Sequence, residues 1–381
     1  MAKLGEICAF QSGGTPSKNK PEYFGGEIPW ISTTALNGGK INEADAVAWI
    51  TPKAIRESAA KIVPANSIMV GTRVGIGKVA INTVEMSTSQ DVISLIGIDK
   101  DKWYKPYLCK LLLSKKDYFN SQARGATIKG IKIDVVANID VPEIDYATQR
   151  KVAATLSKID TLIVLRKQQL AKLDELVKAR FVEMFGDPIR NEKGWNTYTL
   201  AEMCDGIGDG LHGTPEYDEN GEYPFINGNN LISGIIQINP STKKVNKKTY
   251  EKHYIKISQN AILLSINGTL GRIAFYNSEQ VMLGKSACYC NLRDEVNRIF
   301  VYNIMKTDAF ARYLEDNATK STIKNVGLKA IREYRLIMPP IPLQNQFSSF
   351  VERVDQQKQT VQQSLEKLEL MKKVLMQEYF G

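Results

Sequence analysis

The chain carries an internal repeat. An ending made of an acidic residue, two bulky apolar residues and a glycine occurs as EMFG at 183–186 and again as EYFG at 378–381. Gly186 and Gly381 lie 195 positions apart, and sliding the 381-residue sequence against itself by about that offset aligns five more segments in order. These are LGEIC (4–8) with LAEMC (200–204), GTP (14–16) with GTP (213–215), IPWIS (28–32) with YPFIN (223–227), GKVAI (77–81) with GRIAF (271–275), and ATIKGI (126–131) with STIKNV (321–326). We interpret the chain as a tandem duplication, and the near-complete divergence between these anchors indicates two versions of one binding module.

Each copy has two parts of different character. The first parts, 1–143 and 187–340, are rich in Gly, Asn, Thr and short β-branched runs broken by turn residues, which predicts mixed, mainly β domains with a few helices. One helix is expected near 104–114, with its counterpart near 300–314. The second parts, 144–186 and 341–381, carry apolar residues at three- and four-residue steps. They predict amphipathic helices of about 35 residues and about 50 Å.

A long helix with a narrow apolar seam cannot bury itself alone, so we expect the two helices to pair antiparallel as a coiled coil. The alternative is that each helix packs on its own domain. The predicted fold is α+β: two tandem domains separated by two long antiparallel helices, with a pseudo-twofold repeat. Aromatic residues should anchor the helix ends, with Gly186 and Gly381 as C-caps. The expected partner-binding residues of the helices are Leu176, Phe181, Phe185, Met371 and Phe380.

Composition narrows the class of protein. With 43% hydrophobic and 24% charged residues, the chain is expected to be folded, and the sequence shows neither an apolar membrane span nor a signal-peptide core, which places it in the cytoplasm. Five scattered cysteines favour reduced thiols, and with two histidines nothing completes a metal site. The formal net charge of +9 indicates a polyanionic partner, although basic proteins without one are common.

The chain lacks the motifs of an enzyme. Its one Pro-Pro pair, Pro339-Pro340, lies between Met and Ile, so it cannot form the polar loop with which an adenine methyltransferase holds its target amino group. The glycines of GTRVGIG (71–77) match neither a Walker loop nor a dinucleotide fingerprint, and they predict a hairpin turn instead. His253 lies among lysines, and His212 beside GTP is better placed for a partner than for a catalytic triad. We expect no catalytic residue.

The sequence resembles the DNA-specificity subunits of type I restriction-modification enzymes. The opening LGEICAFQSGGTPSKNKPEYFGGEIPWI looks like the start of a target-recognition domain, and VPEIDYATQRKVAATLSKIDTLI and MPPIPLQNQFSSFVERVDQQKQ look like the two shared helical regions. One departure is Val141-Pro142-Glu143, which lacks a doubled proline. The resemblance implies a non-catalytic subunit that binds double-stranded DNA and two methyltransferase subunits, which modify adenine at its exocyclic nitrogen, and that restriction subunits can join. It also implies that no cofactor is bound here, because the methyltransferase subunits bind S-adenosylmethionine.

Sequence-specific DNA recognition needs amides, hydroxyls and guanidinium groups on loops, with lysines near phosphates. In the first copy we expect DNA contacts from Thr15, Ser17, Lys18, Lys20, Trp30, Ser32, Thr33, Thr34, Arg73, Lys78, Ser89, Gln90, Arg124 and Lys129. In the second copy we expect them from His212, Thr214, Asn227, Asn229, Asn230, Asn267, Arg272, Lys285, Lys320 and Lys324. A single lysine is equally consistent with a solvated charge, and INGNN (226–230) with a turn, because Asn and Gly tolerate left-handed backbone.

Two function hypotheses of different classes remain at this stage. The first is a specificity subunit that reads two unlike half-sites about one DNA turn apart, with a fixed non-specific spacer between them. The second is a non-catalytic coiled-coil scaffold or adaptor that is basic for unrelated reasons. A stand-alone nuclease or methyltransferase is disfavoured by the missing motifs.

Overall fold

The computed structural model describes residues 1–125 and 127–381, so Ala126 of the ATIKGI anchor lies outside the described residues. The chain divides into two compact units. Unit 1 comprises Met1–Gln168 and Gln362–Gly381, and unit 2 comprises Gln169–Val361. Each unit therefore combines a mainly β region with one part of each of two long helices.

Unit 1 is built on two sheets. The larger has the order β2 (Ala9–Ser12), β10 (Val92–Ile96), β7 (Ile68–Gly71), β8 (Val79–Asn82), β4 (Lys40–Ile41), and the smaller has the order β5 (Ala48–Ile50), β3 (Phe24–Ile31), β9 (Met86–Thr88), β6 (Ile62–Val63). All residues of β7 and β8 are buried. Their runs IMVG and VAIN do not alternate apolar with polar residues, which is the pattern of strands covered on both faces.

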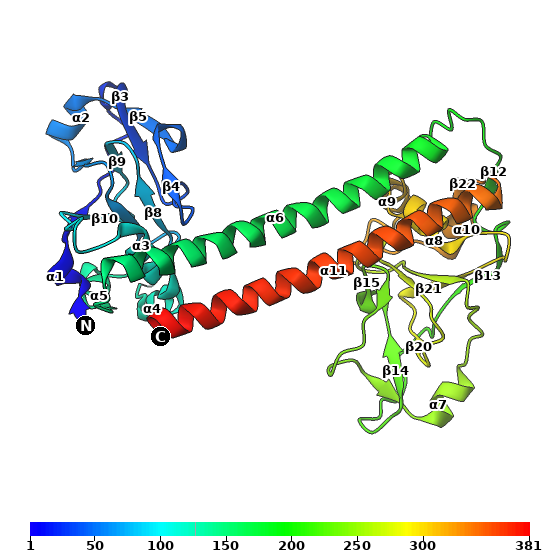
Figure 1. The fold of residues 1–381 in the computed structure, drawn as a ribbon. Coiled ribbons are helices and arrows are strands. Elements are labelled where there is room, and N and C mark those ends of the chain that lie inside the picture. The colour runs from blue at the N-terminus through cyan, green and yellow to red at the C-terminus, as the bar shows by residue number, and fades with distance from the viewer. Residues whose placement is uncertain (126) are drawn as a thin grey trace. The chain divides into compact units, whose positions relative to one another are not determined.

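Helices cover the larger sheet of unit 1. α3 (Lys105–Ser114) brings Leu108, Leu111 and Leu112 into one core with Val70 and Val79 of the sheet. The remaining short helices are α1 (Leu4–Ile7), η1 (Pro21–Tyr23), η2 (Glu43–Asp45), α2 (Pro52–Glu57), α4 (Lys116–Gln122) and α5 (Ile133–Ala137). Figure 1 shows α3 beside β8 and the start of the first long helix. The predicted helix near 104–114 is confirmed.

Unit 2 repeats this frame. Its larger sheet has the order β13 (Cys204–Asp209), β21 (Ala287–Leu292), β18 (Ala261–Ser265), β19 (Ile273–Phe275), and its smaller sheet the order β17 (Lys244–Val245), β14 (Tyr223–Ile226), β20 (Met282–Leu283). β14 pairs parallel with β20 and antiparallel with β17, just as β3 pairs parallel with β9 and antiparallel with β5. The duplication read from the sequence is therefore a duplication of topology. Unit 2 adds a small hairpin of β15 (Leu231–Ile232) and β16 (Ile235–Ile236).

The expected helix near 300–314 is two helices. α8 (Arg298–Met305) ends before Thr307, which caps α9 (Asp308–Asp316) by accepting a bond from the Phe310 amide at 3.4 Å. The Thr307 hydroxyl also donates to the Ile304 carbonyl at 2.7 Å, so one side chain ends one helix and starts the next. The other short helices of unit 2 are η3 (Gly228–Asn230), α7 (Lys247–Lys252) and α10 (Leu328–Glu333).

A two-stranded sheet ties together the ends of each β region. In unit 1, β1 (Ala2–Lys3) pairs antiparallel with β11 (Asp140–Val141). In unit 2, β12 (Thr197–Thr199) pairs antiparallel with β22 (Arg335–Ile337). Both β regions thus bring their first and last strands together just before a long helix begins.

The two long helices are α6 (Tyr146–Phe185) and α11 (Ile341–Phe380), each 40 residues. At about 1.5 Å per residue each is roughly 60 Å long, somewhat more than expected from the sequence. They run antiparallel in both units: Asp160 pairs with Lys372 and Lys167 with Glu369 in unit 1, and Asp174 pairs with Lys358 in unit 2. Among the described residues, no helix is long and apolar enough to cross a membrane.

The helix ends are anchored by aromatic residues. Phe181 and Phe185, near the end of α6, are buried in the core of unit 2 with Phe300 and Phe347. Phe380, at the end of α11, is buried in the core of unit 1, and the last turn of α11 lies beside α4 in Figure 1. Gly186 closes α6 with φ +76° and donates its amide to Val182 O at 2.8 Å, as expected of a glycine C-cap.

Candidate nucleic-acid interface

Five loops of unit 1 meet at the ends of its strands. We call residues 13–15, 32–34, 72–78, 89–91 and 127–130 loop cluster 1. Backbone hydrogen bonds join them: Gly14 N to Thr88 O at 2.9 Å, Ser89 N to Ile31 O at 2.8 Å, Thr72 N to Asp91 O at 2.8 Å, and Ile131 N to Thr72 O at 2.8 Å. Trp30 Nε1 adds a bond to Gly14 O at 3.0 Å. These loops therefore form one surface, although their residues lie far apart in the sequence.

Unit 2 has a second cluster on the same backbone frame. Loop cluster 2 comprises residues 210–214, 227–230, 266–272, 284–286 and 322–326. Gly284 N donates to Ile226 O at 2.8 Å, Ile266 N to Ser286 O at 3.1 Å, and Val326 N to Ile266 O at 2.9 Å. Each bond matches one of loop cluster 1. The two clusters can therefore be compared position by position.

The predicted hairpin turn is present in both units. Residues 71–78 join β7 to β8, and residues 265–272 join β18 to β19. In both turns the first residue bonds the last (Gly71 N to Lys78 O, 2.9 Å; Ser265 N to Arg272 O, 2.8 Å), and a glycine near the end has positive φ (Gly77, +74°; Gly271, +78°). The side chains on this shared frame differ, because Arg73 corresponds to Asn267 and Lys78 to Arg272.

The candidate DNA-binding residues of unit 1 differ in how far their side chains are exposed to solvent. The exposed ones are Thr15, Ser17, Lys18, Lys20, Thr34, Arg73, Lys78, Gln90, Arg124 and Lys129, and Ser32 and Trp30 are half-buried. Thr33 and Ser89 are each only 4% exposed. The expectation that these two side chains reach DNA is therefore wrong for this structure, because the close packing of the loops covers them.

One lysine of the opening loop has a neighbour outside the cluster. Lys20 Nζ donates to the Tyr23 hydroxyl at 2.9 Å and lies 5.0 Å from the centre of the Tyr23 ring. This hydrogen bond raises the pKa of Lys20 above its usual value, so the side chain stays charged. Lys20 thus adds positive charge beside η1 and α2 rather than within loop cluster 1.

In unit 2 the exposed candidates are His212, Thr214, Asn229, Lys285, Lys320 and Lys324, and the half-buried ones are Asn227, Asn230, Asn267 and Arg272. Asn227 and Asn230 support the turn: the Asn227 amide donates to Asn230 Oδ1 at 2.9 Å, and Asn230 Nδ2 donates to Gln237 O at 3.0 Å. Asn229, between them, exposes its side chain. Arg272 Nη1 reaches the Asn229 carbonyl at 3.3 Å, which brings these two candidates together.

Acidic side chains lie beside three of the candidate residues. Asp91 lies 3.9 Å from Arg73 Nη1, Glu315 pairs with Lys324, and Asp209 Oδ2 lies 2.7 Å from His212 Nε2. Five of the six side chains belong to the loops or to β13, which ends at loop cluster 2, and Glu315 lies on α9. On an exposed surface such contacts contribute modest free energy and limit the conformations of the side chains that they join.

Two exposed isoleucines escaped the sequence reasoning. Ile128 is 63% exposed and Ile323 is 64% exposed, and each sits in the Thr-Ile-Lys segment of its cluster. The sequence marks these segments as repeat anchors, and an apolar residue in an anchor suggests core rather than surface. The signal that could have singled out these two residues is the identical Thr-Ile-Lys tripeptide in the two copies.

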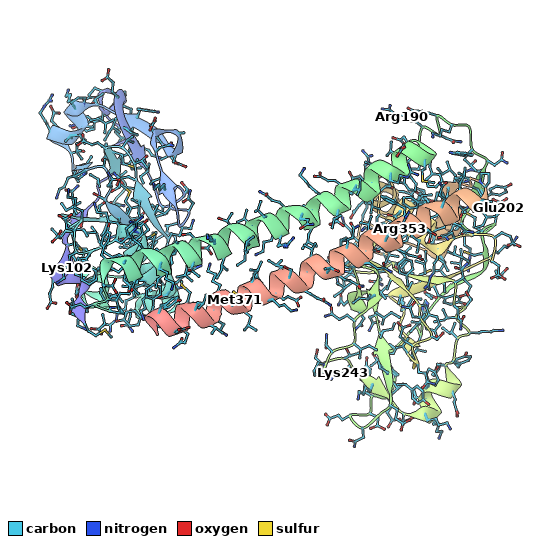
Figure 2. All side chains as sticks on the ribbon, viewed as in Figure 1. Lys102, Arg190, Glu202, Lys243, Arg353 and Met371 are labelled. Atoms are coloured by element: carbon cyan, nitrogen blue, oxygen red, sulfur yellow. The ribbon has the colours of Figure 1, made fainter. Side chains whose placement is uncertain are left out.

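The helix pair offers a separate surface in unit 2. A groove of about 540 Å³ lies between α6 and α11, lined by Leu176, Ala179, Arg180, Glu183, Gln346, Phe350 and Arg353. Arg180 pairs with Glu183 at 2.8 Å and lies 5.9 Å from the centre of the Phe350 ring. Figure 2 labels Arg353 and Met371, both on α11. Leu176 is 46% and Met371 51% exposed.

Three of the five expected partner-binding residues are buried within the chain. Phe181, Phe185 and Phe380 are 5%, 0% and 3% exposed. Assigning them to a partner surface was wrong, because they fill the cores of units 1 and 2. Leu176 and Met371 are exposed, as residues that bind a partner subunit must be.

Comparison with known proteins decides the family. The model of the type I restriction modification DNA specificity domain matches residues 1–175 and 192–370, that is, nearly all of both copies. The chain belongs to this family. Its role in a type I restriction-modification system is DNA recognition, and it is not the catalytic subunit.

Individual relatives agree with this assignment. The chain is 25% identical over 389 aligned positions to the type I restriction enzyme MjaIX specificity subunit of Methanocaldococcus jannaschii, covering 92% of this chain and 85% of the relative. It is 30% identical over 166 positions to the EcoR124I/EcoR124II specificity subunit of Escherichia coli, covering 42% of this chain and 40% of that one.

Solved structures support the fold of this specificity subunit. The crystal structure of an S subunit from M. genitalium matches with a TM-score of 0.60 at 17% identity, covering all of this chain and 95% of the other. A chain from a structural study of complex assembly and conformational transition in the type I R-M system matches with a TM-score of 0.61 at 18% identity, covering 100% and 96%. The predicted α+β fold with two long helices is thus confirmed.

Proposed function

We propose that this specificity subunit reads two unlike half-sites of duplex DNA, one with each loop cluster, and positions two methyltransferase subunits to methylate adenine at N6. Restriction subunits join the same assembly when the DNA is to be cleaved. The methyltransferase subunits carry S-adenosylmethionine, and the complex acts in the cytoplasm. This proposal makes units 1 and 2 separate readers of one bipartite site.

The observation that carries the proposal is a shared backbone frame with different side chains. Arg73 in loop cluster 1 is replaced by Asn267 in loop cluster 2, Gln90 by Lys285, and Thr34 by Asn229. In the major groove, Arg suits the two acceptors of guanine, whereas Asn suits adenine, which presents one acceptor and one donor. Two loop clusters on the same backbone frame with different donors and acceptors should select different bases, so the site should not be a palindrome.

Other positions keep their charge in both units. Lys78 and Arg272 close equivalent turns, and Lys129 and Lys324 follow equivalent isoleucines. The two units are proposed to recognise different sequences, so cations that both units share should contact the phosphate backbone, which is the same in every sequence. The DNA between the half-sites should then be bound without sequence preference, and the two half-sites should lie about one helical turn apart.

The helix pair supplies a surface for the methyltransferase subunits. Leu176 of unit 2 and Met371 of unit 1 occupy positions 195 residues apart, and both expose about half of their side chains. Apolar groups at matching positions of the two copies suit two copies of one partner. The groove beside Leu176 gives this partner an apolar recess with charged edges.

Methylome sequencing of a host that carries the gene with its neighbouring methyltransferase gene tests the function. The expected result is a new, bipartite and asymmetric motif with methylated adenine in each half. A host with the methyltransferase gene alone serves as the control and should lack the motif. If the complex assembled but neither methylated nor bound duplex DNA, the scaffold hypothesis would replace this one.

A further inference from the structure

The Thr-Ile-Lys segments occupy the same place in the two units. In unit 1, a backbone hydrogen bond from Arg124 N to Gly130 O, 2.9 Å long, closes the loop that carries Ile128. In unit 2, the hydrogen bond from Thr319 N to Asn325 O, also 2.9 Å long, closes the loop that carries Ile323. Each loop then bonds the neighbouring hairpin turn, through Ile131 N to Thr72 O and Val326 N to Ile266 O. The two isoleucines are therefore equivalent in position.

The exposure of these isoleucines is the unexplained feature. Ile128 is 63% and Ile323 64% exposed, on short loops with tight backbone bonding. A single exposed apolar side chain is common and needs no explanation. The same exposed tripeptide at the same place in both copies does need one, because other exposed positions of the loop clusters, such as Gln90 and its counterpart Lys285, have diverged.

The surroundings of both isoleucines are cationic. Lys129 follows Ile128, Arg124 closes its loop, and a Cβ on Gly130 would meet Arg73 Cγ at 3.0 Å, which places the Arg73 stem beside the loop. In unit 2, Lys324 follows Ile323, Lys320 precedes it, and Gly268 N bonds Lys324 O at 2.9 Å. The centre of a protein-protein interface is depleted of lysine, whereas a DNA-binding surface is enriched in positive charge.

Because the Thr-Ile-Lys segment is present in both units, it cannot distinguish the two half-sites. It should therefore contact a feature of DNA that the two half-sites have in common. Resting on the proposed function, we propose that Ile128 and Ile323 are sequence-independent DNA anchors, one in each unit. Each isoleucine packs against the stacked bases and sugars of a groove, and the lysine that follows it, Lys129 or Lys324, binds a flanking phosphate. Apolar side chains flanked by cations make such contacts where proteins widen or kink a duplex.

Substitution by serine tests this inference in the complete complex with its methyltransferase subunits. Ile128→Ser and Ile323→Ser should each weaken binding to duplex DNA by about tenfold, and the double variant by about a hundredfold if the two sites act independently. The loss should be similar for DNA with the specific site and for DNA with either half-site scrambled. Fluorescence anisotropy with labelled duplexes measures all of these affinities.

Ile189→Ser is the matched control, because Ile189 is also 63% exposed but follows α6 outside both loop clusters. It should leave DNA affinity unchanged. If the Ile128 and Ile323 variants bound duplex DNA with wild-type affinity, the proposed function would be unaffected, whereas this inference would be wrong. Loss of methyltransferase co-purification with unchanged DNA affinity would also overturn it and would assign the loops to a protein contact. If the wild-type complex bound no duplex DNA, the proposed function itself would fail, and the anchors with it.

Discussion

The ring of Phe380 packs against the ring of Tyr107, with centroids 5.2 Å apart and planes inclined by 54°. Phe380 is the last residue of α11 and Tyr107 lies on α3, so the C-terminal end of the chain completes the core of unit 1. In unit 2, Phe185 at the end of α6 meets Phe300 of α8 with centroids 4.9 Å apart. Each long helix therefore begins in one unit and ends in the other.

This arrangement predicts crossed effects of two matched substitutions. Phe380→Ala should destabilise unit 1, and Phe185→Ala should destabilise unit 2, each by about 3–5 kcal/mol because a buried ring is lost. Hydrogen exchange, followed region by region, should show faster exchange in β7 and β8 for Phe380→Ala and in β18 and β21 for Phe185→Ala. Glu378→Ala, at an exposed position, serves as the control. Faster exchange in the same unit for both phenylalanine variants would contradict the assignment.

A carboxylate between two lysines stabilises the helix pair in unit 1. Asp160 Oδ2 lies 2.7 Å from Lys110 Nζ, and Asp160 Oδ1 lies 2.6 Å from Lys372 Nζ. Burial acts to raise the pKa of Asp160, but the hydrogen bonds from Lys110 and Lys372 outweigh it and lower the pKa below its usual value. Because Lys110 is only 8% exposed, Asp160→Asn should cost about 1–3 kcal/mol of unfolding free energy near pH 7.

The pH dependence follows from the sign of this shift. A depressed pKa in the folded state stabilises the protein above the unfolded value of about 3.9, and the gain is lost as pH falls through the folded value. Denaturant titrations should therefore show the full difference between wild type and Asp160→Asn near pH 7 and a shrinking difference below about pH 4. Asp355→Asn, at the position 195 residues later, removes a carboxylate that is 56% exposed and should have little effect. A difference that stayed constant with pH would rule out the ionic contribution.

Close backbone approach makes one glycine critical to loop cluster 1. A Cβ on Gly13 would lie 2.1 Å from Ser89 O and 2.3 Å from Thr88 Oγ1, so Gly13→Ala must displace the loop that carries Gln90. We expect a cost of about 1–3 kcal/mol and loss of recognition of the half-site read by unit 1. Gly210→Ala, which would meet Leu283 O at 2.1 Å, should act on the other half-site. Methylation assays on duplexes with one half-site altered separate the two effects, with Gly327→Ala, which meets no atom within 4 Å, as the control.

The exposed apolar residues of the helices predict the partner surface. Leu176→Glu and Met371→Glu should each reduce co-purification of the methyltransferase subunit, because a charge would be buried in an apolar contact. Folding should be unaffected, since both side chains are about half exposed in this chain. Ile238→Glu, at a loop position that is 44% exposed, is the control. Normal co-purification with both helix variants would remove these residues from the interface.

The sequence was most informative about repeated features. The EMFG and EYFG endings, the anchor pairs and the apolar periodicity predicted the duplication, the two helices and their antiparallel pairing, because each depends on local pattern. The break at Thr307 was missed, since one side chain that caps a helix leaves the apolar pattern almost continuous. Phe185 and Phe380 anchor the helix ends as predicted, but their assignment with Phe181 to a partner surface was wrong, because aromatic residues of other elements, such as Phe300, Phe347 and Tyr107, cover them.

The candidate site was predictable to the level of its loops. Polar and basic residues near turns pointed to segments that come together as one loop cluster in each unit, but Thr33 and Ser89 are buried where neighbouring loops close over them. Such packing depends on long-range contacts, including Ser89 N to Ile31 O and Thr72 N to Asp91 O, which no local pattern reveals. Asn227 and Asn230 likewise have the composition of a recognition loop but serve the turn.

Exchange of one recognition region tests the central proposal most directly. Residues 1–143 are replaced by the corresponding region of a family member with a different DNA specificity, and the sites methylated by the hybrid complex are mapped by methylome sequencing. If each loop cluster reads its own half-site, one half of the motif changes to that of the donor, while the other half and the spacer length stay the same. A motif altered in both halves, or unchanged in both, would contradict the proposal that units 1 and 2 read DNA separately.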